Sequence, residues 1–261
     1  MKIKQSIVYG FLAVILTFAL AFTACSKSGG GGAGSSGSSG GGGGKSLNSA
    51  AELKEYLDKQ PANSPDNPIK VAMKVNDMMI KDIVEVLNNA GKYVSLDLSG
   101  SPLTEIPGAA FRFCKTLVGI IIPDSVTSIG HEAFRNCTNL TNITIPNSVT
   151  NIGMAFIDCV SLTGVTIPNS VTSIWGTAFF GCTGLTSVTI PNSVTSIGES
   201  AFDCENLTSV TFQGTISSSN FGGRNGLSPF NGDLRNKYLA GGIGTYTTTA
   251  PVKWESIWTK Q

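Results

Sequence analysis

The chain has 261 residues, of which 13% are charged, and its formal net charge at pH 7 is +1. This length is enough for one or two domains with a buried core. The near-neutral charge gives no basic surface for a polyanion, so the sequence predicts no binding to nucleic acid.

The chain begins with the pattern of an export signal. Lys2 and Lys4 precede a long uncharged run, and a retained membrane helix is the alternative for this run. The run ends in FTAC, residues 22–25, which resembles the lipobox of bacterial lipoproteins, with Phe22 where Leu or Val is usual. The resemblance implies a signal peptide over residues 1–24 and lipidation of Cys25. It therefore implies an exported protein anchored to a bacterial membrane, the outer one where there are two.

A linker follows the predicted lipidation site. Residues 29–44 consist of 11 Gly, 4 Ser and 1 Ala, a composition that gives flexible, unpacked chain. We therefore expect residues 25–45 to be a tether between the anchor and a folded body.

Residues 46–93 carry the signals of two helices and one strand. SAAELKEYLDKQ predicts a helix with Ser49 as its N-cap, and IKVAMKV predicts a strand. A second helix is expected to start after Asn76 and to stop at Gly91. This pattern predicts an α/β cap at the start of the next region.

Residues 94–212 contain an internal repeat. The phrase IPNSVTSIG and its near-copies recur, and the repeat units start at Leu117, Leu140, Leu162, Leu185 and Leu207, in steps of 22 or 23. Such self-similarity is typical of a solenoid, in which each coil buries its apolar face only by stacking on its neighbours. The two 22-residue units lose a residue before Ala155 and before Cys204. We expect outer loops at both places.

Within each unit the apolar positions predict the path of one coil. Leu-x-x-Val-x-Ile indicates a strand that ends at a Pro, VTSI a second short strand, and AFFGC one turn of helix. One Phe of each unit should stack along the solenoid interior: Phe134, Phe156, Phe179 and Phe202.

These units resemble the leucine-rich repeats of BspA-like bacterial surface proteins. The resemblance implies a β-rich α+β solenoid: a right-handed stack of 22–23-residue coils with a parallel sheet. It also implies display at the cell surface and adhesion to host matrix proteins or to other cells.

Residues 213–261 are expected to form a C-terminal cap. DLRNKYLA predicts a short helix, and GTYTTTAPVKWESIW predicts a hairpin. Trp254 and Trp258 are four residues apart, which in a strand places both on one face. We expect both to cover the last coil, with a ligand cage as the alternative.

The reactive residue types do not form a catalytic pattern. One Cys recurs per unit, and equivalent side chains on stacked coils point in parallel, which predicts a buried, reduced ladder without disulfides or metal. His131 is the only histidine, and its equivalents Gly176 and Glu199 indicate an outward-facing position. We therefore predict no enzyme and no cofactor. A hydrolase with its site in residues 213–261 remains a minor alternative.

Two surfaces are candidates for binding a partner. The first is the concave strand face, whose outward side chains include Asn142, Thr144, Thr166, Ser187, Thr189, Ser209 and Thr211. A merely solvated face is the alternative. The second is an apolar patch made by Ile157, Trp175 and Phe180, because the other units have Gly at the position of Trp175 and Arg or Asp at that of Phe180. Local packing around Trp175 is the alternative there.

The sequence thus predicts a non-enzymatic, lipid-anchored, monomeric protein of the cell surface. Its expected partner is a host matrix or cell-surface protein. The alternative from a different class is a structural or antigenic envelope lipoprotein without a dedicated ligand.

Overall fold

The computed structural model describes residues 46–222 and 228–261. The export signal, Cys25 and the tether lie outside the described residues, so the signal over residues 1–24, the lipid anchor and the tether over residues 25–45 stay predictions. Among the helices of the described part of the chain, none combines the length and the apolarity that crossing a bilayer requires.

The first helix, α1 (Ala50–Asp58), starts where its cap residue predicts. The Ser49 side chain accepts a hydrogen bond from the Glu52 N–H at 3.1 Å, which satisfies one of the free donors of the first turn. Leu53 and Leu57 are fully buried, so the apolar stripe of α1 faces the core.

The next strand and helix are also confirmed. Strand β1 (Ile69–Ala72) leads to a 3-10 turn, η1 (Asp77–Met79), and then to α2 (Ile80–Ala90). Asn76 caps η1 through its side chain, and Gly91 ends α2 with a left-handed φ of 58°. The predicted helix therefore begins with one 3-10 turn, which is wound more tightly than an α-helical turn.

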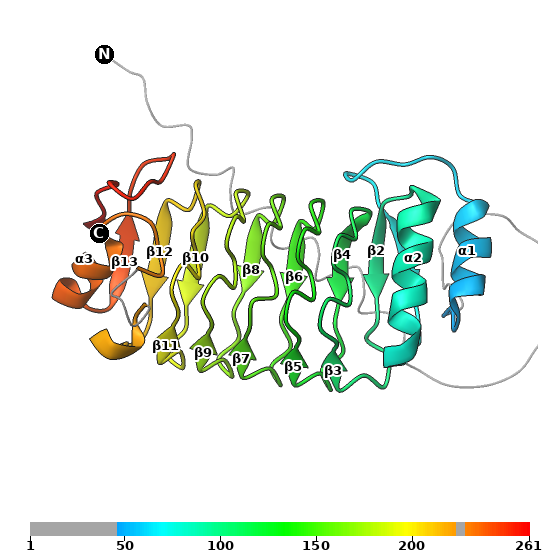
Figure 1. The fold of residues 1–261 in the computed structure, drawn as a ribbon, viewed down its shortest axis with the longest axis horizontal. Helices are drawn as coiled ribbons and strands as arrows, with labels where there is room; N and C mark the ends of the chain where they lie inside the picture. The colour runs from blue at the N-terminus through cyan, green and yellow to red at the C-terminus, as the bar shows by residue number, and fades with distance from the viewer. Residues whose placement is uncertain (1–45, 223–227) are drawn as a thin grey trace, which may run out of the picture. The chain divides into compact units, whose positions relative to one another are not determined.

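Each of the first five coils contributes a strand to a front row and a strand to a second row, and the sixth contributes a front strand (Figure 1). The front row consists of β2 (Val94–Asp97), β4 (Leu117–Ile121), β6 (Asn142–Thr144), β8 (Gly164–Thr166), β10 (Ser187–Ile190) and β12 (Ser209–Phe212). The second row consists of β3 (Glu105–Ile106), β5 (Ser128–Ile129), β7 (Asn151–Ile152), β9 (Ser173–Ile174) and β11 (Ser196–Ile197). Paired strands of one row are parallel and one coil apart, as in β6–β8 and β9–β11. We number the coils 1 to 6 after their front strands.

The third side of each coil is a turn segment, where the expected turn of helix is absent. In coil 4 the Phe180 N–H donates to the Thr177 carbonyl at 3.2 Å and the Cys182 N–H to the Phe179 carbonyl at 3.3 Å, as in successive tight turns. Thr177 has a φ of 57° and Gly181 a φ of 72°, and a left-handed residue interrupts a right-handed helix. The prediction of a helical turn in AFFGC was therefore wrong.

The two shorter coils confirm where a residue can be lost. Coil 3 lacks the counterpart of Thr177, and coil 5 lacks the counterpart of Gly181, as the coil-to-coil hydrogen bonds show. Both missing residues would occupy left-handed turn positions outside the strands. Deleting such a residue shortens a turn and leaves the apolar interior in register.

The interior is one cluster of buried side chains that runs through all coils. Its center is a single file of stacked rings, whose centroids lie between 5.0 Å (Phe179–Phe202) and 5.4 Å (Phe134–Phe156) apart. The four predicted members are confirmed, and Phe111 and Phe230 extend the file at its two ends. The core members among the described residues lie between Leu53 and Trp258, within the compact unit of residues 44–261, so residues 46–261 share one core.

The front row is interrupted between β8 and β10. One sheet has the order β1-β2-β4-β6-β8, and a second has the order β10-β12-β13-β14. Thr163 donates to the Thr141 carbonyl and Thr208 to the Thr186 carbonyl, both at 3.0 Å, but among the described residues no such bond runs from the Thr186 N–H to coil 4. The second row stays paired here through β9 and β11. Coils 4 and 5 are therefore joined on two sides of the solenoid and open on the third.

A buried hydroxyl marks the same junction. In coil 4 the Ser170 hydroxyl donates to the Val149 carbonyl of the preceding coil at 2.7 Å. The equivalent Ser193 of coil 5 has its hydroxyl oxygen shielded from solvent without a hydrogen-bond partner. The junction between coils 4 and 5 thus lacks this hydroxyl bond in addition to the pairing of the front strands.

The C-terminal residues close the solenoid with an antiparallel strand. The 3-10 turn η2 (Ser218–Asn220) and helix α3 (Leu234–Gly241) come before β13 (Gly244–Thr247), which pairs with β12 and with β14 (Thr259–Lys260). The predicted helix and hairpin are confirmed, although the second strand of the hairpin starts only after Trp258.

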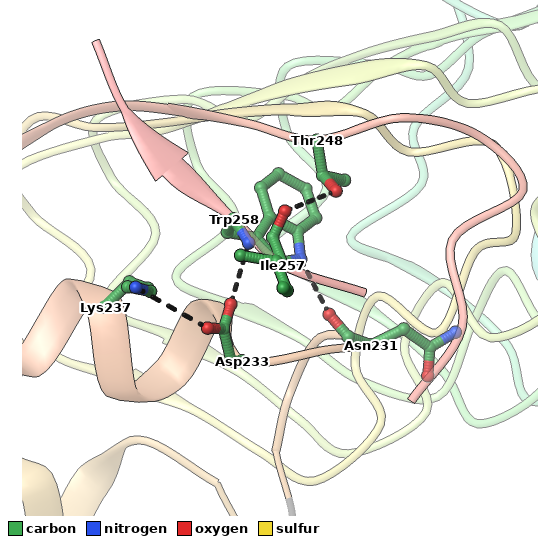
Figure 2. A network of polar contacts seen from close by, with 6 residues as sticks. All are labelled: Asn231, Asp233, Lys237, Thr248, Ile257 and Trp258. Atoms are coloured by element: carbon green, nitrogen blue, oxygen red, sulfur yellow. Dashed lines mark hydrogen bonds and ion pairs between the residues drawn. The ribbon is translucent and has the colours of Figure 1, made fainter. Parts of the chain in front are cut away.

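The two tryptophans of this segment have different environments. Trp258 is 1% exposed, and Figure 2 shows its backbone N–H donating to the Asp233 carboxylate (2.8 Å) and its ring N–H to the Asn231 carbonyl (2.9 Å). Trp254 is 85% exposed, so the prediction that both cover the last coil was wrong for Trp254. The chain turns between Lys253 and Ser256, and the alternation of faces in a strand does not apply across a turn.

Candidate protein-binding site

The front strands carry an uncharged surface, as the repeat predicts. Five of its seven predicted side chains are exposed: Asn142, Thr144, Thr166, Ser187 and Thr189. Ser209 and Thr211 are half-buried, because β13 pairs onto β12 and the Thr211 hydroxyl lies 2.9 Å from that of Thr245.

The break in the front row divides this surface. Asn142, Thr144 and Thr166 belong to the first sheet, and the other four residues belong to the second. Hydroxyl and amide groups at the strand spacing of about 4.8 Å offer hydrogen bonds but no charge and no nucleophile with an adjacent base. Chemically, this surface suits polar contact with a partner rather than catalysis.

A second surface is formed by the outward side chains of the turn segments, residues 107–114, 130–137, 153–159, 175–182 and 198–204, which we call the turn face. In coil 4 Trp175 is 54% exposed and Phe180 is 39% exposed, whereas Ile157 of coil 3 is half-buried. The structure therefore places two of the three predicted patch residues in solvent. It also exposes two apolar residues that the sequence analysis missed, Phe113 (48%) and Val160 (40%). The signal was present, because other coils have Asn, Asp or Gly at the position of Phe113 and Lys, Thr or Glu at that of Val160.

The missing residue of coil 3 explains how the solenoid accommodates Trp175. A Cβ at the equivalent Gly198 would lie 2.3 Å from the Gly176 nitrogen, so that position admits only glycine without a shift. A Cβ at Gly153 would meet nothing closer than the Ile129 carbonyl at 3.7 Å. The backbone N–H of Trp175 donates to the Ile152 carbonyl at 2.8 Å, directly before the shortened turn of coil 3.

The recurring cysteines form the expected buried ladder of free thiols: Cys114, Cys137, Cys159, Cys182 and Cys204. Each thiol from Cys137 onward donates to the carbonyl of a core Phe in the preceding coil, as Cys159 does to Phe134 at 3.1 Å. Burial raises the pKa of Cys159 to about 12, and it raises that of Cys182 well above its ordinary value. The Cys159 and Cys182 thiols therefore stay protonated at neutral pH, and the buried ladder serves as packing.

The remaining histidine and carboxylate side chains of the described residues offer no metal site. His131 is exposed on the turn face, as its variable position predicts. In the part of the chain that the structure describes, no three His, Cys, Asp or Glu side chains gather as a metal site would require.

Together these features define a leucine-rich-repeat solenoid with an α/β segment before it and a helix and hairpin after it. Residues 104–227 match the model of the BspA type leucine rich repeat region in six copies. The chain therefore contains a BspA-type leucine-rich-repeat region over these residues. No curated protein matches the chain.

Several solved structures are similar to parts of the chain. A leucine rich repeat protein from T. pallidum is 40% identical over 45% of this chain and 58% of its own, with a TM-score of 0.43. A leucine rich cell surface protein from Faecalibacterium prausnitzii is 33% identical over 56% and 43%, with a TM-score of 0.46. A leucine-rich repeat protein from Bacteroides ovatus is 37% identical over 43% and 28%, with a TM-score of 0.37. The chain thus spans less than two thirds of each.

The family defines the general role. Leucine-rich repeats are scaffolds whose extended surfaces typically mediate protein interactions, and such proteins are generally non-enzymatic.

Proposed function

We propose that the protein is a lipid-anchored, non-enzymatic adhesin of the bacterial surface that binds a host matrix or cell-surface protein through its repeats. The observation that carries the proposal is the exposure of Trp175 and Phe180 on the turn face. In the same coil the interior residues Phe179 and Cys182 are fully buried, so the apolar side chains in solvent are departures from the repeat.

Exposed aromatic side chains on a rigid scaffold support a binding role for a physical reason. Trp and Phe bring large apolar area to a contact at a low cost in conformational entropy, because each has only two side-chain torsions. The hydrogen bonds between adjacent turn segments fix the backbone beneath them, as between the Phe179 N–H and the Ala201 carbonyl at 2.8 Å. The uncharged front strands can add hydrogen bonds over a wider area.

The test measures binding of residues 46–261 to immobilized extracellular-matrix preparations and to host cells. The turn-face variant combines Trp175→Gly, the residue found at the equivalent Gly153, with Phe180→Gln. The matched front-face variant combines Thr166→Arg with Thr189→Arg. Circular dichroism and urea unfolding establish that each variant is folded.

The proposal predicts saturable binding. The affinity should fall at least tenfold in the turn-face variant and stay unchanged in the front-face variant. Loss in the front-face variant alone would move the site to the strands. No saturable binding to any preparation would contradict the adhesive role and favor a structural or antigenic envelope protein.

The anchor is tested separately in the full chain. Metabolic labelling with palmitate should mark the protein and place it in the membrane fraction, and Cys25→Ser should abolish both. Labelling that persists in the Cys25→Ser variant would contradict lipidation at this residue.

A further inference from the structure

The charges of the turn face are distributed unequally along the solenoid. Coils 1 and 2 contribute Arg112, Glu132 and Arg135, whereas the turn segments of coils 3 to 5 contain Asp158, Glu199 and Asp203 and no Lys or Arg. The exposed Trp175 and Phe180 lie in coil 4, between the acidic residues of coils 3 and 5.

The register of these residues follows from the hydrogen bonds between turn segments. The Asp158 N–H donates to the Phe180 carbonyl at 2.8 Å, and the Gly181 N–H donates to the Asp203 carbonyl at 3.0 Å. The Thr177 N–H donates to the Glu199 carbonyl at 2.9 Å. Each acidic residue is therefore held within one coil of the aromatic pair, at the interstrand spacing of about 5 Å per coil.

The two ends of the turn face differ in how their charges are compensated. Arg112 lies 3.0 Å from the Glu132 carboxylate, and Arg135 binds the same carboxylate, so one Glu bridges two Arg side chains. Among the described residues, Asp158, Glu199 and Asp203 take part in no ion pair, and Asp203 accepts only a neutral hydrogen bond, from Asn231 at 2.5 Å. Coils 3 to 5 thus present three carboxylates to which no Lys or Arg of residues 46–222 and 228–261 is paired.

We propose that the turn face of coils 3 to 5 binds a basic, partly apolar segment of a partner protein. Its apolar side chains pack on Trp175 and Phe180, and its Lys or Arg side chains approach Asp158, Glu199 and Asp203. This inference rests on the proposed protein-binding role and names the chemistry of the partner.

Charge and geometry select this partner over others. The three carboxylates repel a polyanion and an anionic lipid surface. They are spread over coils 3 to 5 instead of converging on a metal. A cation beside an exposed Trp also gains from the ring quadrupole, which favors Lys and Arg over neutral polar residues. The positive charge of Arg112 and Arg135 excludes basic groups from coils 1 and 2, so the bound segment is confined to coils 3 to 5.

The experiment uses residues 46–261 and three fluorescent peptides of equal length, measured by anisotropy. One peptide alternates Lys and Leu, the second alternates Glu and Leu, and the third alternates Lys and Ser. We expect saturable binding of the Lys/Leu peptide, at least tenfold tighter than that of the other two, and weakening as salt screens the carboxylates.

Two variants separate the contributions. Asp158→Asn with Glu199→Gln and Asp203→Asn should weaken the Lys/Leu peptide at least tenfold. These changes keep the size of each side chain, and Asn suits the left-handed backbone of residue 158 (φ 58°). Trp175→Gly with Phe180→Gln should weaken the Lys/Leu peptide and leave the Lys/Ser peptide unchanged.

The matched control removes the same charge elsewhere. Glu55→Gln, Asp66→Asn and Glu85→Gln neutralize three exposed carboxylates of residues 46–93, and binding should change less than twofold. An equal effect of both triple variants, equal binding of the Lys/Leu and Glu/Leu peptides, or no binding of any peptide would overturn the inference.

The outcome is distinguishable from failure of the proposed function. Binding to matrix or cells that requires Trp175 and Phe180 but survives neutralization of the three carboxylates would keep the adhesin and refute the basic partner. Selective peptide binding without any binding to matrix or cells would keep the basic partner segment and refute the adhesin.

Discussion

The file of stacked rings makes a quantitative prediction about the stability of the solenoid. Phe179 is fully buried, and its ring lies 5.1 Å from that of Phe156 and 5.0 Å from that of Phe202. Truncation to Ala removes the transfer free energy of the ring, leaves a cavity and ends two stacked pairs. Each such pair adds about 0.5–1.5 kcal/mol beyond area burial. Phe179→Ala should therefore lower the free energy of unfolding by about 3–5 kcal/mol.

The neighboring residue supplies a matched control for this prediction. Phe180 is the same residue type, one position further along the chain, and it is 39% exposed. Phe180→Ala should cost less than about 1 kcal/mol, because most large losses on truncation come from cavities in the core. Urea unfolding of residues 46–261, followed by circular dichroism, measures both variants. Equal losses, or a loss below about 1 kcal/mol for Phe179→Ala, would refute the assignment of stability to the stacked file.

Three further predictions concern the thiols, the glycines and the open junction. Burial raises the pKa of Cys159 to about 12, whereas an unfolded Cys ionizes near pH 8.5. Because the raised pKa favors the protonated folded state, the free energy of unfolding should be constant below about pH 8 and fall as the pH rises toward 12, by about 2 kcal/mol at pH 10. Urea unfolding at several pH values should show a smaller fall for Cys159→Ala. Gly198→Ala should destabilize by about 1–3 kcal/mol, because its Cβ would clash with the Gly176 nitrogen at 2.3 Å. Gly153→Ala should cost less than about 0.5 kcal/mol, because its Cβ would lie 3.7 Å from the Ile129 carbonyl oxygen, an ordinary contact. Equal urea midpoints for the two variants would refute this. The Thr186 amide should exchange with deuterium at least tenfold faster than the Thr163 amide, which donates to Thr141; equal protection by NMR would show that the front row is closed.

The arrangement of the repeat could be predicted from the sequence because every coil packs against neighbors like itself. Equivalent positions meet equivalent environments, so Phe134, Phe156, Phe179 and Phe202 had to share one place in the interior, and the cysteines had to share another. The helices at Ser49 and Asn76 were equally predictable, since caps are local hydrogen bonds. The exposed aromatic residues of coil 4 were found by the same logic, as departures from the repeat.

Other features failed to follow from local pattern. The sequence of the turn segments predicts a helical turn, but residues with left-handed backbone such as Thr177 interrupt it. A non-glycine residue with positive φ has no strong sequence signal. Trp254 was assigned to the face of a strand, but the chain turns there and leaves it in solvent.

The sequence by itself determined the coil length and the strand and interior positions, because periodicity encodes contacts that repeat. Only the tertiary structure decided the break between β8 and β10, the extension of the file to Phe230 and the lack of an ion pair, among the described residues, at Asp158, Glu199 and Asp203. These depend on how one coil lies on the next and on which charges come within reach across coils, and neither quantity is contained in the repeat of a single unit.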